Sequence, residues 1–503
     1  MKTCLTESTK ISRRSFLQAL GALTLSGSLA ACGGTGKAKS DRLAAGSLAY
    51  TPDEVVTVEF SDGGITVSPE DAAGLAVEGT ALSVSGAGVY ALSGSCADGS
   101  VKVEARTENV VLLLDGLTLT STDTAPIVCG ESTGVTIAVV DGTENTLTDS
   151  EANDPDNAAD NEKAEKAVVK CKDGSQAVLC GGGALTVNAR GKNGIKSGTA
   201  LDDRDASLTI RELTLNIEAL VNDAINAEQR LKVESGNLTI AAGEDAIHCD
   251  MELNVGAEGT TGPAITVSTC CEGLEGAVLN IHSGNMDITS TDDCLNAANS
   301  DLGDYAFEMN ISGGTIKAYS SGGDGFDSNG TLTITGGDIS VWTANAADNQ
   351  PLDADGRITI SGGTVLAAGG SAGMGFSISA SQPYVTFGGG RDSSLSLAGG
   401  EAFSIADESG KSVLDSTALC DAAFLFYSSP ALTTEGRYSV QSTVTATAKT
   451  GEADPQFGGN GGPGGSGGQR PDGMTPPDGQ MPQGQPPQSD GTTPPELPTA
   501  SSN

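Results

Sequence analysis

The middle of the chain contains an internal repeat of about 26 residues, and this repeat restricts the possible folds more than any other feature. One half of the repeating unit is a pair of short alternating apolar segments joined by a glycine turn. Three near-copies occupy residues 310–316, 333–339 and 359–365, which read NISGGTI, TITGGDI and TISGGTV. Residues 280–286 and 233–238 are weaker copies. Such repetition indicates a solenoid, in which each unit buries its apolar face against the next.

The other half of the repeating unit is one apolar residue between polar ones. These apolar centres also recur about every 26 residues, and they are Ile195, Ile225, Ile247, Leu274, Leu295, Phe326 and Leu352. A leucine-rich repeat has a similar period but needs a Leu-x-x-Leu-x-Leu pattern and an Asn ladder, which are missing. A β-sandwich does not repeat in this way. We therefore expect an all-β protein, a right-handed parallel β-helix with one coil per repeat.

The segments on either side of the repeats set the predicted boundaries of the solenoid. Residues 110–119 and 135–142 resemble earlier coils with blurred spacing, and the acidic segment 151–166 is expected to be a protruding loop. The 69 glycines and 4% aromatic residues suit short strands and tight turns. We expect the β-helix to span residues 51–440. Residues 451–503 are rich in Gly, Pro, Gln and Ser, cannot bury a core and are expected to be disordered.

The N-terminal residues predict export. Residues 12–17 read SRRSFL, a twin-arginine signature, and an apolar run too short for a membrane span follows it. The run ends in Leu29-Ala30-Ala31-Cys32, which resembles the lipobox of bacterial lipoproteins. We expect residues 1–32 to be a signal peptide with Cys32 lipidated, and residues 33–50 to be a flexible tether. The protein would then be anchored to the outer face of the cytoplasmic membrane, at the cell surface. The alternative is a soluble exported protein.

A formal net charge of -38 makes nucleic acid and anionic lipid poor partners and favours cations. A large acidic excess is also a common solubility device in exported proteins. Only two histidines are present, so histidine triads and multi-histidine metal sites are nearly excluded. No Cys spacing suggests zinc, and we expect the scattered cysteines to be mostly small buried side chains. We expect a monomer.

The placement of the acids favours calcium. Two residues before each apolar centre the chain reads Asn193, Asp223, Asp245, Glu272, Asp293, Asp324 and Gln350. One residue after it the chain reads Lys196, Asn226, His248, Glu275, Asn296, Asp327 and Asp353. The later position projects outward by strand alternation, whereas the earlier one faces outward only if the small residue just before the centre marks a bend that breaks the alternation. Like charges stacked about 4.8 Å apart repel, and calcium would compensate them. The alternative is that Asp and Asn are there as turn formers.

Two aromatic residues have equivalent positions on neighbouring coils. Tyr319 follows Ile316 by three residues, and Trp342, the single Trp of the chain, follows Ile339 by three. We expect the two rings to stack in solvent as a platform for sugar faces. The alternative is that one or both are covered by a loop or a strand edge.

Catalysis has less support in the sequence. A polysaccharide lyase would need a base beside calcium, and Lys196 and Lys317 are the available bases. Both are otherwise ordinary surface lysines. A carboxyl pair for glycoside hydrolysis arises by chance on an acid-rich solenoid, so such pairs indicate nothing.

The sequence also resembles a known family. Residues 323–328 (GDGFDS), the ISGGTI turns and residues 141–149 (DGTENTLTD) are similar to the carbohydrate-binding domain family typified by a clostridial cellulose- and acidic-sugar-binding β-helix, as are residues 88–94 and 426–430. The resemblance covers residues 84–440. It implies a scaffold similar to pectate lyases, calcium on the aspartates of the Asp-Gly motifs, and polysaccharide binding without established catalysis. The calcium role carries over to Asp223, Asp245, Asp293, Asp324 and Asp327.

The chain departs from the family pattern at several coils. Ala224, Ala246 and Cys294 stand where Gly is usual, and Gln350-Pro351 replaces Asp-Gly. These departures put the metal sites at those coils in doubt. The sequence as a whole predicts a surface-anchored, non-catalytic polysaccharide-binding protein that uses calcium. A calcium-dependent lyase on acidic polysaccharide, or a structural surface protein or adhesin, is the alternative.

Overall fold

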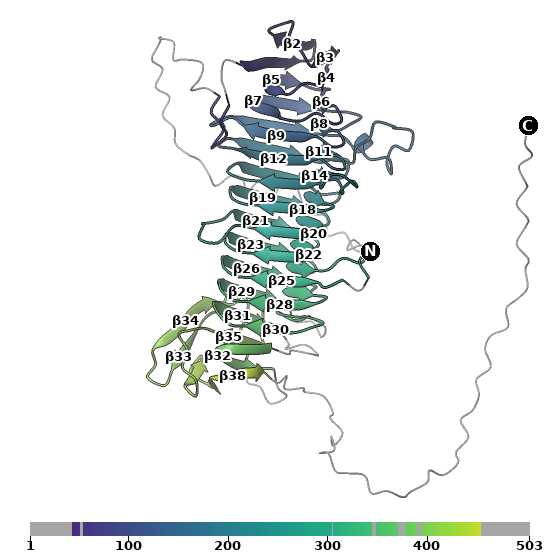
Figure 1. The fold of residues 1–503 in the computed structure, drawn as a ribbon. Coiled ribbons are helices and arrows are strands. Elements are labelled where there is room, and N and C mark those ends of the chain that lie inside the picture. Colours follow the sequence, from purple (N-terminus) through teal and green to yellow (C-terminus); the bar gives the residue numbers. More distant parts are fainter. Residues whose placement is uncertain are drawn as a thin grey trace, which may run out of the picture. The chain divides into compact units, whose positions relative to one another are not determined.

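The computed structural model describes residues 43–50, 54–303, 305–344, 349–370, 378–389 and 395–453 (Figure 1). These residues belong to a compact unit, Met1–Gly458. A second unit, Gly459–Asn503, lies outside the described residues, as do the predicted signal peptide and Cys32. The regular secondary structure of the described residues is almost entirely β-strand, in a 34-stranded sheet and a four-stranded sheet. No helix among them has the length and hydropathy of a membrane span.

Most strands lie in three rows, and each strand of a row pairs in parallel with the equivalent strand of the next coil (Figure 1). Row A carries the apolar centres identified in the sequence. Its members are β4 (Ala81–Val84), β6 (Ser100–Val103), β8 (Ile127–Cys129), β11 (Ala167–Cys171), β14 (Asn193–Ser197), β17 (Ile225–Ala227), the first parts of β20 (Ile247–Val255) and β22 (Leu274–Ile281), β24 (Leu295–Ala297) and β27 (Phe326–Ser328).

Row B follows row A along each coil. Its members are β1 (Val55–Ser61), the first parts of β5 (Gly88–Cys96) and β7 (Val110–Thr120), β9 (Gly134–Val139), β12 (Gln176–Gly181), β15 (Ser207–Ile210), β18 (Arg230–Val233), the second parts of β20 and β22, β25 (Glu308–Ile311), β28 (Thr331–Ile334), β30 (Ile358–Ile360) and β32 (Ile378–Gly388).

Row C closes each coil. Its members are the second parts of β5 and β7, β10 (Glu144–Thr148), β13 (Ala184–Asn188), β16 (Thr214–Ala219), β19 (Asn237–Ala242), β21 (Ala264–Thr269), β23 (Asn285–Ser290), β26 (Thr315–Ser320), β29 (Asp338–Thr343) and β31 (Thr364–Gly369).

The repeat predicts the register of the coils correctly. In row A, Ile195 pairs with Ile225 and the remaining centres follow in the order read from the sequence, ending with a bridge between Phe326 and Leu352. All seven centres have no exposed surface. Parallel strands with one face turned into the stack bury every second side chain, so a shift of one residue would expose the whole set. The apolar spacing therefore fixes how coil sits on coil.

Antiparallel strands border the parallel stack at both ends. At the N-terminal end, β1 pairs with β2 (Gly64–Ser68) and β4 pairs with β3 (Leu75–Glu78). At the C-terminal end, β35 (Phe424–Ser428) pairs with β31 and β32, and β38 (Lys449–Ala453) pairs with β32. Beside them lies the four-stranded sheet of β34 (Ser412–Thr417), β33 (Ala402–Asp407), β36 (Arg437–Val440) and β37 (Val444–Thr447).

These ends differ from the sequence prediction. Parallel coils were expected as far as residue 440, but the strands after β32 pair antiparallel, because residues 395–453 alternate as ordinary hairpin strands without the 26-residue repeat. The predicted disordered segment also begins too early, since residues 449–453 form β38. The remainder of that segment, residues 454–503, lies outside the described residues.

Residues 43–50, which were assigned to a flexible tether, contact the outer face of row B. Ala45 is fully buried among the side chains of β5, β7, β9 and β12. The backbone N–H groups of Gly46 and Ser47 donate to Asp141 and Glu212, at 2.7 and 2.8 Å. A Cβ at position 46 would meet Glu212, and Gly46 has a φ of 57°, so the close approach requires glycine. The prediction for this part of the tether is therefore wrong.

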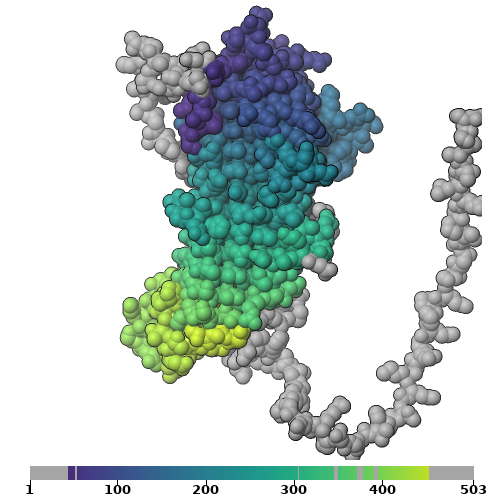
Figure 2. All heavy atoms as spheres, in the orientation of Figure 1, coloured from purple at the N-terminus to yellow at the C-terminus, as the bar shows by residue number. Residues whose placement is uncertain are grey.

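The acidic segment 151–166 leaves the stack between β10 and β11, as predicted, and projects from it (Figure 2). It contains a short 3-10 helix, η4 (Glu151–Asn153), capped by the Ser150 hydroxyl. Asn153 is fully buried, and its side-chain amide donates to Asp149 and to the Ala167 carbonyl. These bonds hold the base of the loop against the coil.

Candidate functional site

The acids that flank row A face outward because the strand alternation breaks just before each apolar centre. Ala224 and Ile225 are consecutive and both fully buried, and Ala246 with Ile247 repeats the pattern. A Cβ at Gly325 would meet the carbonyl oxygen of Pro351 at 2.4 Å, which shows how little space this position has. Two consecutive inward residues leave the positions before and after them on the outside. The assumption on which the predicted acidic ladder depends is thus correct.

Each of the four aspartates before the centres accepts a hydrogen bond from a backbone N–H group with one oxygen. Asp223 accepts the N–H of Asp245 at 3.2 Å, and Asp245 accepts that of Glu272 at 3.3 Å. Asp293 accepts the N–H of Asp324 at 2.6 Å. Each bond joins one coil to the next at the bend, so these acids do act as turn formers. A carboxylate has two oxygens, and the second is left for a partner at the outer surface.

His248 is the partner in the middle of the row. Its Nδ1 lies 3.1 Å from Asp245 and 2.5 Å from Glu275, and its Nε2 lies 2.8 Å from Asp250. Both ring nitrogens face carboxylates, as in a doubly protonated imidazolium. Burial alone would lower the pKa of His248, but the hydrogen bonds to the three acids raise it well above its usual range. One cation thus compensates several stacked acids.

No cation of the described residues occupies the corresponding place near the C-terminal end of the row. Asp324, Asp327 and Asp353 place one oxygen each within 4.8 Å of one another. We call these three residues the aspartate cluster. Burial, followed by repulsion from the neighbouring carboxylates, raises the pKa of Asp324 to about 7 and that of Asp327 to about 6. Burial also raises the pKa of Asp353. The folded chain therefore holds three acids that resist ionisation together.

Two acids between His248 and the aspartate cluster share this electrostatic strain. Burial, followed by repulsion from Glu275 and Asp245, raises the pKa of Glu272 to about 9. Burial raises the pKa of Asp293 to about 8, although the N–H of Asp324 opposes the shift. Groups of acids with raised pKa values on one surface are frequent at functional sites.

Two buried carbonyl oxygens beside the aspartate cluster have no hydrogen-bond partner among the described residues. They are Oδ1 of Asn296 and Oε1 of Gln350, whose residues are 7% and 6% exposed. Asn296 pairs with Asp327 across the coils, and the N–H of Gln350 donates to Asp324. An oxygen that accepts no hydrogen bond is costly to bury unless a cation or water satisfies it.

The structure separates the residues to which the resemblance assigns calcium. Asp324 and Asp327 belong to the aspartate cluster, and Asp293 is linked to Asp324 through its backbone. Asp245 instead belongs to the His248 group, and Asp223 accepts a hydrogen bond from Asn226 at 2.7 Å. The predicted calcium ligands did not include Glu275, Asp353 and His248, although the sequence places all three one position after an apolar centre, in the register of Asp327.

The two predicted bases have different surroundings. Lys317 is half exposed and pairs with Asp287 in row C, away from row A. Lys196 lies in row A, where it pairs with Glu228 at 2.9 Å and donates to Asn226. The sequence missed Lys170, which is the strand partner of Lys196 on the preceding coil. Burial and the charge of Lys196 lower the pKa of Lys170.

The aromatic platform is wrong as predicted. Tyr319 and Trp342 are strand partners on adjacent coils, as expected, but Trp342 has no exposed surface and Tyr319 is partly buried. The antiparallel C-terminal sheet covers them, and the ring of Phe403 meets Trp342 edge-on at 6.0 Å. The indole N–H donates to Ser340. Trp342 therefore belongs to a core and offers no face to a sugar.

Comparison with known proteins places the chain in a family. A family model described as carbohydrate-binding domain-containing protein matches residues 78–373, which is more than half of the chain. A carbohydrate-binding domain-containing protein of Acetivibrio thermocellus is 30% identical over 184 residues, or 36% of this chain and 60% of the relative. The match thus spans 60% of the length of that curated relative.

A solved structure is also similar. It is described as the polysaccharide lyase-like protein from C. thermocellum, gadolinium derivative; the match covers 65% of this chain and 94% of that one, with 21% identity and a TM-score of 0.30. The resemblance read from the sequence motifs is confirmed by the family model. The chain belongs to the family of carbohydrate-binding domain-containing proteins.

Proposed function

We propose that the protein is a surface-anchored, non-catalytic binder of polysaccharide, cellulose-like or acidic and pectin-like, that holds calcium on row A. Membership of a carbohydrate-binding family supports a polysaccharide ligand. The observation that carries the calcium part is the aspartate cluster, where three carboxylates converge within 4.8 Å. Without a cation, these carboxylates repel one another in a partly buried place.

The donor set of the aspartate cluster fits calcium. Three carboxylates and the buried carbonyl oxygens of Asn296 and Gln350 are all hard oxygen donors, which calcium prefers in groups of six to eight. No histidine or thiol is part of this set, so a soft transition metal is a poorer match. Calcium bound there would neutralise the cluster and could bridge to a carboxylate of an acidic sugar.

The anchor and the handedness of the coils are part of the same proposal. The twin-arginine and lipobox residues support export and lipidation at Cys32. Parallel pairing between equivalent strands of successive coils supports a right-handed parallel β-helix, because crossovers between parallel strands of one sheet are almost always right-handed. A Cys32→Ala variant is expected to leave the membrane fraction of the producing cell and appear as soluble protein.

A calcium-dependent lyase is the second candidate. The observation in its favour is the pair Lys170 and Lys196, because burial beside a second ammonium lowers the pKa of Lys170 and increases the fraction of its amine that is free to accept a proton. A lyase would release unsaturated uronates with ultraviolet absorbance from an acidic polysaccharide. Loss of that absorbance in Lys170→Ala or Lys196→Ala would support it, and Lys317→Ala serves as the comparison from row C.

The deciding experiment for the main proposal is a binding assay with the mature, calcium-loaded protein. Insoluble cellulose and soluble polygalacturonate are offered with calcium and again with a chelator. We expect binding to at least one of them, and weaker binding to the acidic polymer when the chelator is present. A protein that binds neither polymer would overturn the proposed function.

A further inference from the structure

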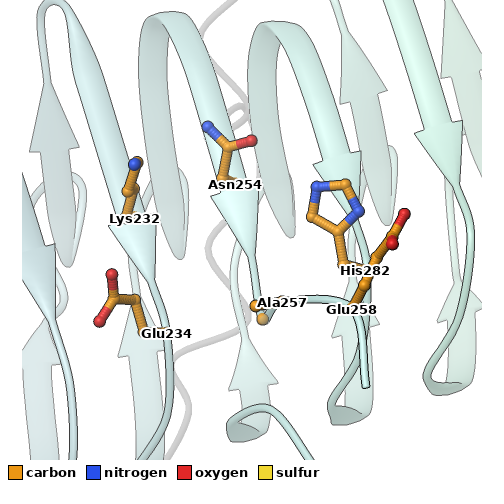
Figure 3. A pocket seen from close by; sticks show the side chains of 7 residues that line it. Lys232, Glu234, Asn254, Ala257, Glu258 and His282 are labelled. Carbon is orange, nitrogen blue, oxygen red and sulfur yellow. The ribbon is translucent and has the colours of Figure 1, made fainter. Parts of the chain in front are cut away.

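A pocket on the outer face of row B lies apart from the aspartate cluster (Figure 3). Two of the residues that line it lie on strands, Lys232 on β18 and Asn254 on β20. The others directly follow β18, β20 and β22, and they are Glu234, Gly256, Ala257, Glu258 and His282. Lys232, Asn254 and His282 stand on successive coils along it, with Glu234 and Glu258 at the edges (Figure 3). This set contains no residue of the acidic ladder.

Hydrogen bonds hold the wall of the pocket in place. The β20–β21 loop (residues 256–263) carries Ala257 and Glu258. The N–H of Ala257 donates to the Ser283 hydroxyl at 3.1 Å, and that hydroxyl donates to the Ala257 carbonyl at 3.0 Å. Thr260 lies 3.0 Å from the same hydroxyl. Gly256 has a φ of 69° and touches Ser283 so closely that no Cβ would fit. The wall is therefore formed before any ligand arrives.

The charged side chains of the pocket have no ion-pair partner among the described residues, whereas the Asn254 amide donates to Glu252 at 3.0 Å. In the described part of the chain, no ion pair involves Lys232, Glu234 or Glu258, although a positive side chain and two negative ones share the pocket. His282 has one polar contact there, with the Ser312 hydroxyl at 3.1 Å. The pocket thus offers an ammonium and an imidazole beside two carboxylates.

A ladder of amides continues the pocket along the coils. Asn254, Asn280 and Asn310 are strand partners on three coils. The Asn280 amide donates to Asn254 at 3.2 Å, and the Asn310 amide donates to Asn280 at 3.1 Å. All three are partly exposed, so each has hydrogen-bonding capacity left at the surface. Their spacing of about 4.8 Å repeats along the axis of the coils.

We propose that this row B surface, made of the pocket and the Asn254–Asn280–Asn310 ladder, is a subsite for the hydroxyl groups of a glycan chain. A sugar hydroxyl both donates and accepts, and the surface presents donors and acceptors side by side over three coils. The inference rests on the proposed polysaccharide binding and adds a second contact surface, apart from the proposed calcium site. Binding here depends on hydroxyl groups and needs no metal.

The test compares two double variants of the mature protein. Lys232→Ala with Asn254→Ala removes two side chains of the subsite, whereas Lys411→Ala with Asn216→Ala removes the same residue types elsewhere on the outer surface. Affinity for a soluble cello-oligosaccharide and for an oligogalacturonate is measured by calorimetry, with calcium and with chelator. Thermal unfolding of both variants shows whether they fold like the wild type.

We expect the subsite variant to bind either oligosaccharide about tenfold more weakly in both conditions, because two hydrogen-bonding groups are lost. The control variant should bind like the wild type, and both should keep the calcium-induced rise in melting temperature. A second variant, Ala257→Met, fills the pocket without removing a polar group and should weaken binding as well. Wild-type affinity in the subsite variants would overturn the subsite while leaving polysaccharide binding intact. A wild type that binds neither sugar would instead overturn the proposed function.

Discussion

The Nδ1 atom of His248 lies 2.5 Å from Oε2 of Glu275, the residue at the same position on the following coil. With Asp245 and Asp250 as its other partners, this imidazole is the positive group in the acidic part of row A, between Asp223 and Asp353. The negative charges stacked along the row are therefore compensated by two kinds of cation. One is a cation supplied by the chain, and the other, at the aspartate cluster, is the cation that we propose from solution.

Replacement of His248 is expected to destabilise the fold. His248→Gln removes the positive charge and leaves three carboxylates facing one another, which should cost about 3 kcal/mol of unfolding free energy. The midpoint of chemical denaturation at neutral pH measures the loss. His282→Gln is the matched control, because His282 contacts one hydroxyl and no acid among the described residues. Equal midpoints for the two variants would contradict the role given to His248.

Calcium is expected to stabilise the protein through the aspartate cluster. Saturating calcium should raise the melting temperature of the wild type by a few degrees, because a ligand that binds the folded state alone stabilises it. Asp324→Asn with Asp327→Asn should abolish this rise. Asn keeps an oxygen that accepts the Gln350 N–H but removes the charge.

The control for the cluster is Asp287→Asn, which changes an exposed acid of row C. This variant should show the same calcium response as the wild type. If the cluster variant also responds to calcium like the wild type, calcium does not bind at Asp324 and Asp327.

Stability without calcium is expected to fall as the pH rises. The folded-state pKa values of Asp324, Asp293 and Glu272 are raised to about 7, 8 and 9, above the value near 4 of an unfolded chain. At a pH between the unfolded-state and the folded-state pKa values, the folded chain binds more protons than the unfolded chain. A rise in pH through this range therefore favours unfolding. In chelator, the melting temperature should be lower at pH 8.5 than at pH 5.

Calcium should weaken this pH dependence, because it replaces protons at the carboxylates. The rise in melting temperature on adding calcium should be larger at pH 8.5 than at pH 5. A metal-free protein that becomes more stable between these two pH values would show that the acids ionise freely and carry no strain.

Trp342 is expected to act as a core residue. Trp342→Ala removes a fully buried indole between β29 and the C-terminal sheet and should cost roughly 3 kcal/mol or more. Tyr319→Ala, which removes a partly buried ring on the neighbouring coil, should cost less. Sugar affinity, measured well below the melting temperature, should stay unchanged in both. A stable Trp342→Ala protein that loses sugar binding would reverse this assignment.

The sequence predicted the features that repeat and missed those formed by distant segments. The apolar centres from Ile195 to Leu352 were assigned to the correct coils because each centre must lie over the next one. The burial of Trp342 depends on Phe403, which belongs to a sheet without the repeat. The residues around Trp342 in the sequence therefore do not indicate that this sheet covers its ring. Ala45 lies in a segment of Gly, Ala and Ser that reads as a linker, yet side chains this small fit against a strand face.

The candidate site was predicted in part for the same reason. Asp324 and Asp327 were found because they share one motif, whereas Asp353 joins them from the following coil. A cation is close to some of the acids and not to others, and this depends on distances between side chains of neighbouring coils. These distances are known only from the three-dimensional structure. The amide ladder of row B was missed because Asn254 and Asn280 read as ordinary outward polar residues of a strand.

The antiparallel strands at both ends of the coil stack have a consequence for crowding. Parallel coils left open would offer their unpaired backbone to the next molecule, and proteins concentrated on one surface could then join end to end into filaments. Here β1 and β4 are paired with β2 and β3, and β32 is paired with β35 and β38. In the proposed anchored state, neighbouring molecules would remain separate units. A dense layer of them would bind one polymer through many weak, independent contacts.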